Sequence, residues 1–99
     1  MPLLPSTKEL LVLSLLAEHG DLYGLELVEL SGFRLKKGTV YVTLGRMQGK
    51  GLVRSCVDHD PGAHPGLPRP RYRITAAGER ALTAQQLVHS VLRAARGRA

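Results

Sequence analysis

The residues with the clearest chemical potential follow one another between positions 36 and 53. Their ammonium, guanidinium and hydroxyl groups are those that bind phosphate oxygens and base edges in nucleic-acid complexes: Lys36, Lys37, Thr39, Tyr41, Thr43 and Arg46. Between them, residues recur at the spacing of one helical stripe: Val40, Leu44, Met47 and Gly51. The stretch predicts a recognition helix over about residues 38–50, with one face in the core and the other towards a nucleic acid.

Gly45 and Gly49 lie inside this predicted helix. Each glycine in a helix interior costs roughly 1 kcal/mol relative to alanine. The usual reason for such a glycine is the close approach of another backbone or of a ligand. A frayed second half of the helix is the alternative explanation.

Charge is distributed unevenly along the chain. Residues 1–30 hold one basic and five acidic residues, whereas residues 31–99 hold thirteen basic and three acidic residues. The net charge is therefore −4 in the first segment and +10 in the second. Positive potential around the predicted recognition helix favours a polyanion as the partner. The alternative is that the excess of basic residues reflects a general preference for arginine and not a polyanionic partner.

The composition and motifs exclude several classes of protein. A length of 99 residues supports one hydrophobic core, and the single cysteine, Cys56, forms no intrachain disulfide. We find no nucleophile–base arrangement and no phosphate-binding loop, so we expect neither an enzyme nor a bound cofactor. No signal peptide is visible, and the apolar runs are too short and too often broken by charge to span a bilayer. These features predict a cytoplasmic protein with no membrane partner.

Local signals predict a mainly α chain with a small β-hairpin. Ser6 to Glu9 has the form of a capping box, which starts a helix that ends before Gly20. The elements expected after it are a short helix over 25–30, the recognition helix, strands over 52–58 and 71–75 around a proline-rich loop over 59–70, and a last helix with Thr75 as its N-cap. This order of elements is that of a winged helix-turn-helix, in which the hairpin is the wing.

The segment between the short helix and the recognition helix is expected to close over the core. Glu26, Glu29 and Ser31 are predicted to face water. Gly32 ends the short helix, and either Phe33 or Leu35 is predicted to fill the core beneath the turn.

The first and last helices carry more apolar surface than one small core can cover. The first is apolar on nearly every side, which indicates a helix buried against its own core and against a partner subunit. The last helix has a broad apolar side, but little of the domain is left for that side to pack against. We therefore predict a homodimer, with these residues at its interface: Leu11, Leu15, Leu87, Val88, Val91 and Leu92.

Three segments resemble the signatures of PadR-type transcriptional regulators. Residues 39–53 are similar to the family's T-L-Y-x-x-L-x-x-L-x-x-x-G-L-V. Residues 24–27 look like its G-Y-E-I, and residues 71–78 look like its Y-x-L-T-x-x-G. The sequence departs from the family pattern at Val42, where proline is usual, and at Leu25, where an aromatic residue is usual.

The resemblance implies a homodimeric repressor that binds double-stranded DNA. It places the third helix in the major groove, the wing on the neighbouring backbone or minor groove, and the last helix with the first at the dimer interface. Residues 1–75 would then form the winged helix domain and residues 76–99 the C-terminal dimerisation helix, as in the short subfamily. Neither the operator nor a small-molecule effector is identified.

The predicted DNA-binding residues come from the recognition helix, the turn before it and the wing: Lys36, Lys37, Gly38, Thr39, Tyr41, Val42, Thr43, Arg46, Arg54, Arg69, Arg71 and Arg73. The two lysines and the amides of Gly38 and Thr39 are expected to hold a phosphate at the helix N-terminus. Arg46 can reach guanine, whereas Tyr41 can contact either the groove or a phosphate, of which the phosphate is slightly favoured.

Two other functions remain open. A winged helix can serve as a protein-interaction module, with its basic wing against an acidic partner. A metal- or thiol-responsive sensor is the second alternative, because Asp58, His59, Asp60 and His64 offer ligands near Cys56. A hairpin tip rich in proline and glycine rarely holds ligands rigidly, and a strand cysteine more often fills core space, so no metal site is predicted.

Overall fold

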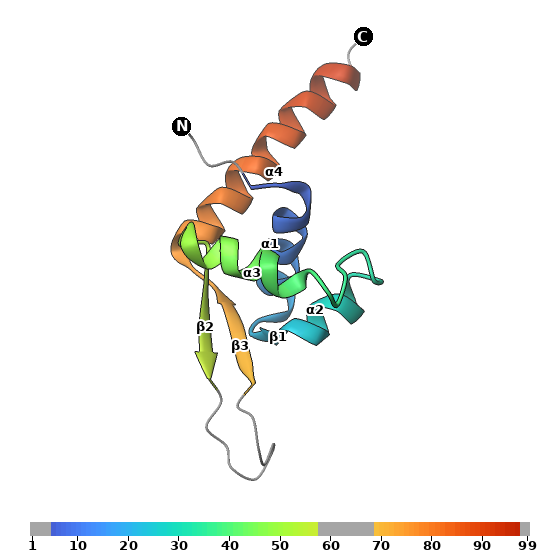
Figure 1. Cartoon of the computed structure of the whole chain (residues 1–99). Coiled ribbons are helices and arrows are strands. Elements are labelled where there is room, and N and C mark those ends of the chain that lie inside the picture. The colour runs from blue at the N-terminus through green and yellow to red at the C-terminus, as the bar shows by residue number, and fades with distance from the viewer. Residues whose placement is uncertain (1–4, 58–68, 98–99) are drawn as a thin grey trace.

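The structure, a computed structural model, describes residues 5–57 and 69–97. Its elements are α1 (Thr7–His19), β1 (Leu22–Tyr23), α2 (Gly24–Leu30), α3 (Val40–Gly49), β2 (Val53–Val57), β3 (Pro70–Ile74) and α4 (Ala76–Gly97) (Figure 1). The expected fold class, mainly α with a β-hairpin followed by a last helix, is confirmed. Residues 58–68, which include Asp58, His59, Asp60 and His64, lie outside the described residues.

Helix α1 starts at the predicted capping box. The Glu9 amide donates to Ser6 Oγ at 3.2 Å, and the Ser6 amide donates to Glu9 Oε1 at 2.8 Å. Gly20 ends the helix with a φ of +85°, a conformation that side chains disfavour. Val12, Leu13 and Leu16 are almost completely buried, so α1 forms the centre of the core.

The sheet has three strands in the order β1-β3-β2, all antiparallel. Between the first two helices, the segment 21–24 contributes β1, whose Leu22 lies opposite Tyr72. Strand β3 begins at Pro70, inside the predicted loop, and a proline is tolerated there because it is the first residue of the strand. Tyr72 is buried while Arg71 and Arg73 are exposed, as the alternation in this strand predicts.

The turn between α2 and α3 differs from expectation at Ser31. This residue is buried, because its hydroxyl donates to Val28 O at 2.8 Å and accepts from the Leu35 amide at 3.0 Å. These bonds direct Leu35 into the core, where it is 1% exposed. Phe33 instead takes a φ of +65° and is 62% exposed, so Leu35 is the residue that fills the core.

At the junction between β3 and α4, the backbone at the start of α4 lies directly against the backbone of residues 51–52, with no side chain between them. Thr75 caps α4, since its Oγ1 accepts from the Gly78 amide at 3.0 Å and donates to Gly51 O at 2.6 Å. The Thr75 amide also donates to Leu52 O at 3.1 Å. A Cβ on Gly78 would collide with Leu52 O and lie 2.9 Å from Ile74 Cγ1, so only glycine fits here. The contact gives the physical reason for Gly78, which lies in the family-like motif but which the sequence alone does not explain.

Helix α4 runs away from the sheet, and its C-terminal half projects beyond α1 (Figure 1). The radius of gyration is 15.4 Å, whereas a compact chain of this length has about 13 Å. The predicted dimer contacts Leu87, Val88, Val91 and Leu92 are 52–64% exposed along this helix. Leu15 differs from them: at 8% exposure its side chain is already used by the core of its own chain.

Replacing Gly78 with alanine is expected to destabilise the protein. The added methyl group must displace backbone, which costs roughly 1–3 kcal/mol in a packed region. The matched control is Gly45→Ala, whose Cβ meets nothing within 4 Å; it should stabilise by about 0.5–1 kcal/mol through helix propensity. Urea unfolding of both variants measures the difference. A Gly78→Ala variant as stable as Gly45→Ala would contradict the close packing.

Candidate nucleic-acid interface

Helix α3 has a buried side and a solvent-facing side that match the predicted stripe. Val40, Leu44 and Met47 are fully buried, which fixes the orientation of the helix about its axis. The predicted contact residues Tyr41 and Val42 are 48% and 55% exposed. Gly45 and Arg46 are also exposed, and Thr43 is half-buried. The fourth member of the predicted stripe, Gly51, lies beyond the helix in a turn with a φ of +74°.

The turn before α3 carries exposed cations, but one of the two amides expected to bind an anion is already used. The Thr39 and Val40 amides donate to the Lys36 carbonyl at 3.1 and 2.8 Å. The Thr39 amide is therefore not available to a phosphate, which corrects that part of the prediction. Thr43 Oγ1 donates to Thr39 O at 3.3 Å. Lys36, Lys37, Gly38 and Thr39 are all exposed, so the two lysine side chains and the Gly38 amide remain candidates for a phosphate contact.

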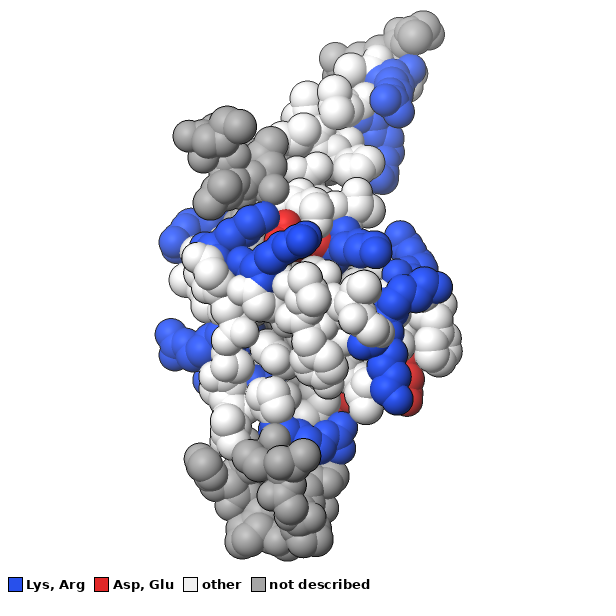
Figure 2. Space-filling view, viewed as in Figure 1, with Lys and Arg blue, Asp and Glu red and all other residues white. Residues whose placement is uncertain are grey.

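The segment from residue 31 to residue 57 holds six basic residues and no acidic residue. Figure 2 shows one face of the molecule on which Lys and Arg side chains are far more prominent than Asp and Glu. Within the described part of the chain, four of the predicted contact residues form no ion pair: Lys36, Lys37, Arg46 and Arg54. A face of this kind attracts polyanions and disfavours acidic neighbours.

Tyr41 leans on the start of α2. A Cβ on Gly24 would lie 2.6 Å from Tyr41 Cε1 and 2.8 Å from Tyr41 Oη, so the glycine makes room for the ring. Burial raises the pKa of the neighbouring Tyr72 hydroxyl, and Tyr41 adds a smaller effect in the same direction. The Tyr41 hydroxyl is thus held at a defined place beside the N-terminus of α2, and the ring links the two helices.

The predicted wing arginines divide into two groups. Arg73 donates to both carboxylate oxygens of Asp21 at 2.8–3.2 Å. The guanidinium groups of Arg69 and Arg71 lie over the Tyr23 ring, 4.5 and 5.0 Å from its centroid. The three arginines at β3 are therefore held by residues at or beside β1. Arg54 on β2 is exposed and lies opposite Arg73 in the sheet register.

The sequence did not single out Asp21, Tyr23 or Gly24 as parts of the site. The ion pair between Asp21 and Arg73 joins residues 52 positions apart. Only the pairing of β1 with β3 brings them together, and a two-residue strand carries almost no local signal. Gly24 did lie in the family-like motif of residues 24–27, but the physical reason for a glycine there is the space that the Tyr41 ring occupies.

Among the described residues, no segment packs closely against the glycines inside α3. A Cβ on Gly45 or on Gly49 would meet nothing within 4 Å. The close approach that such glycines usually serve is therefore not to another segment among the described residues. The outer surface of α3 is left without side chains at these two positions.

The rival metal or thiol site gains no support from the described residues. No group of three or more His, Cys, Asp or Glu side chains is close enough there to hold a metal ion. Cys56 is half-buried on β2 and lies opposite Arg71. The proposed ligands Asp58, His59, Asp60 and His64 are outside the described residues.

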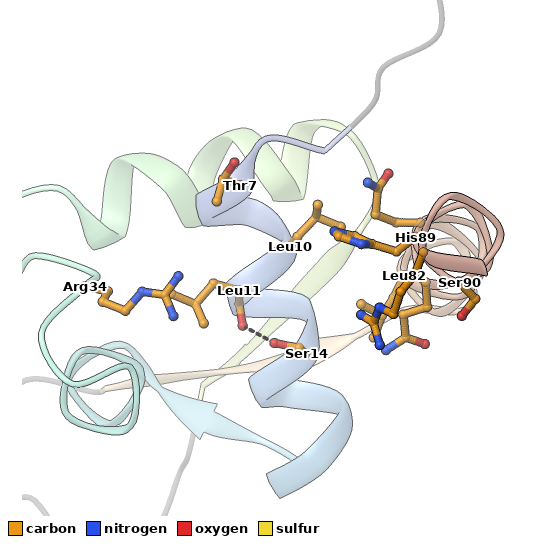
Figure 3. Close-up of a pocket in the computed structure, with 11 residues that line it drawn as sticks. Thr7, Leu10, Leu11, Ser14, Arg34, Leu82, His89 and Ser90 are labelled. Atoms are coloured by element: carbon orange, nitrogen blue, oxygen red, sulfur yellow. Dashed lines mark hydrogen bonds between the residues drawn. The ribbon is translucent and has the colours of Figure 1, made fainter. Parts of the chain in front are cut away.

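A cleft of about 460 Å³ separates α1 from α4. Leu10 of α1 faces Leu82 and His89 of α4 across it (Figure 3). Its lining also includes the predicted dimer contact Leu11, which is half-buried.

Among the described residues, no helix is both long enough and apolar enough to cross a membrane.

Comparisons with known proteins give one consistent result. The model of the transcriptional regulator PadR-like family matches residues 12–84. A PadR family transcription regulator from hypervirulent Clostridium difficile R20291 is 27% identical, with a TM-score of 0.74 over 90% of this chain and 93% of that one. A PadR family transcriptional regulator from Eggerthella lenta DSM 2243 is 30% identical, with a TM-score of 0.72 over 90% and 77%.

One structural match contains nucleic acid. Bacillus subtilis PadR in complex with operator DNA has a TM-score of 0.68, covering 81% of this chain and 46% of that one. At 21% identity this likeness shows the shared fold. Among curated proteins, no sequence match is found.

The pair between Asp21 and Arg73 predicts a measurable pKa. Hydrogen bonds from Arg73 hold the pKa of the Asp21 carboxyl below its ordinary value of 3.8. The pair therefore persists above that value and is lost as the pH falls through the lowered pKa. Arg73→Met should return the Asp21 pKa towards 3.8, whereas Arg54→Met, which removes the charge opposite in the sheet, should change it little. An NMR titration of the Asp21 carboxyl measures this, and an unchanged pKa in Arg73→Met contradicts it.

Proposed function

Because this chain belongs to the PadR-like family of transcriptional regulators, we propose that it is a cytoplasmic, homodimeric repressor that binds double-stranded DNA through helix α3. The observation that carries this proposal is the basic, acid-free segment 31–57, which includes the exposed side of α3. The fold shared with a regulator solved on its operator DNA supports it. The chemistry of the site, which offers cations and hydroxyls but no reacting pair, fits binding and not catalysis.

The exposed side of α3 carries the groups suited to a DNA groove. Arg46 can donate two hydrogen bonds to guanine, and Val42 can pack on a thymine methyl group. Gly45 lies between them on the same exposed side, where its missing side chain lets the helix backbone come close to the bases. Lys36 and Lys37 precede the helix and are placed to contact phosphates, which position the protein without reading sequence.

The wing has a supporting role in this proposal. Arg54 is the β2 cation that is exposed and unpaired within the described part of the chain, and it can contact the DNA backbone. Arg69, Arg71 and Arg73 are engaged by Tyr23 and Asp21 in the absence of DNA. Contacts from these three to phosphates must compete with those partners, so they contribute less than their number indicates.

The exposed stripe on α4 supports the homodimer. Leu87, Val88, Val91 and Leu92 follow one side of the helix at i, i+1, i+4 and i+5. Such a stripe on a projecting helix needs cover, and a second copy of the same helix offers the same apolar surface. A two-fold dimer would also present two α3 helices to successive turns of DNA. A dimer bound in this way excludes other proteins from the same DNA, which is the physical basis of repression.

Two α3 and turn residues are predicted to affect DNA binding differently. Arg46→Ala should weaken binding to a site selected from random DNA by about 10–100-fold and change binding to random duplex little, since a base contact is lost. Lys37→Ala should weaken both by a similar factor and lower the salt slope by about 0.9, the value of one phosphate contact. Fluorescence anisotropy at several salt concentrations measures both.

Each outcome of that experiment has a clear meaning. Equal losses on both DNAs for both variants would contradict the division into reading and positioning residues. No binding of the wild-type protein to any duplex at low salt, with the dimer intact, would favour the protein-interaction module. The exposed Leu30 and Phe33, at 45% and 62%, would then be the first surface to test.

The α4 stripe is predicted to hold the dimer together. Val91→Glu places a charge in the centre of the stripe and should weaken self-association by at least about 100-fold, because a buried unpaired charge costs several kcal/mol. Thr83→Glu adds the same charge at an exposed position of α4 outside both the stripe and the cleft with α1, and should leave the dimer intact. Sedimentation velocity distinguishes the two. A wild-type monomer, or a dimeric Val91→Glu variant, refutes this interface.

A further inference from the structure

Lys50, the residue that follows α3, has an unusual place for a cation of this basic segment. Its Nζ donates to both carboxylate oxygens of Glu9, at 2.9 and 3.1 Å. The Lys50 side chain is 25% exposed and that of Glu9 only 3%. The pair joins the end of α3 to the first turn of α1, across 41 positions of sequence.

Both oxygens of Glu9 accept hydrogen bonds at this place. Oε1 also accepts from the Ser6 amide at 2.8 Å, so one carboxylate both caps α1 and holds the lysine. Burial alone raises the pKa of the Glu9 carboxyl, but the bonds from Lys50 and Ser6 outweigh it, so its pKa lies below the ordinary value of 4.5. The carboxylate is thus charged at neutral pH, and removing Lys50 would leave a buried charge without its partner.

The orientation of α3 needs an anchor at this end. Its buried residues Val40, Leu44 and Met47 fix the rotation of the helix, while Gly45 and Gly49 weaken its second half. Besides Lys50, the side chain of Gln48 holds this half, donating to Ser55 Oγ at 2.9 Å. Among the described side-chain contacts, the ion pair with Glu9 ties the end of α3 to the buried helix α1.

We propose that Lys50 is a positioning residue for the DNA-reading helix, held on α1 by Glu9, and not a phosphate contact. This rests on the proposed DNA-binding function. A count of basic residues on the DNA-facing segment would include Lys50, but its ammonium points into the protein and is neutralised there. Lys50 contributes to binding by fixing the angle at which α3 leaves the core, and therefore how well α3 matches a specific DNA site.

The test compares Lys50 with an exposed lysine of the same charge. Lys50→Met and Lys37→Met are titrated with the selected site and with random duplex at several salt concentrations. Lys37→Met should lower the salt slope by about 0.9 and weaken both DNAs alike. Lys50→Met should keep the wild-type slope and lose roughly tenfold on the selected site, with a smaller loss on random duplex. Lys50→Arg, which keeps the charge and whose longer side chain can still donate to both oxygens of Glu9, should bind like wild type.

A double variant separates positioning from simple loss of charge. In Glu9→Gln/Lys50→Met no buried carboxylate is left unpaired, so binding to the selected site should be stronger than in Lys50→Met alone. A reduced salt slope in Lys50→Met together with wild-type binding in Glu9→Gln would overturn the proposal, because Lys50 would then contact phosphate. Wild-type affinity in Lys50→Met would overturn it as well.

One measurement does not depend on DNA. Hydrogen exchange of the α3 amides should be faster in Lys50→Met than in Lys37→Met, most of all in the last turn, residues 46–50. Equal exchange in the two variants would refute the anchor even if the protein binds DNA. Faster exchange in Lys50→Met, in a protein that binds no duplex, would support the anchor and reject the DNA-binding function.

Discussion

The fold depends on one close approach of backbone to backbone. The turn Gly51–Leu52, where α3 passes into β2, receives the start of α4 through the hydrogen bonds of Thr75 and the bare Gly78. Leu13 of α1 lies against the same glycine. Helix α3, strand β2, the core helix α1 and the projecting helix α4 thus meet at one point. This junction fixes how α4 leaves the rest of the fold.

The cations of this protein are treated in two ways. Those on α3 and the turn before it face solvent with no acidic neighbour in the segment, whereas those at β3 are matched by Asp21 and Tyr23. The sheet register explains the difference, since Arg73 lies opposite Arg54 and two like charges in that position repel. Asp21 offsets this repulsion. The wing is therefore kept in place by interactions that also reduce its charge.

Much of the fold could be read from local patterns, and the exceptions have a common cause. The capping box at Ser6 and the stripe Val40, Leu44, Met47 are short-range signals, and both elements formed where expected. Strand β1, the burial of Ser31 and the ion pair of Arg73 depend on partners that the chain brings near only after folding. The Thr39 amide shows the same limit. The start of the helix was predicted correctly, but the Thr39 amide donates to the Lys36 carbonyl in the turn before the helix. The assignment of contact residues to DNA is a proposal that exposure and charge support.

The two glycines of α3 also affect when this helix exists at all. A ten-residue segment with two glycines has too little intrinsic propensity to be helical alone. Its order depends on packing against α1 and the sheet. Because Val40, Leu44 and Met47 belong to the same hydrophobic core, α3 and that core form and unfold together. The surface proposed to contact DNA therefore exists only in the folded protein.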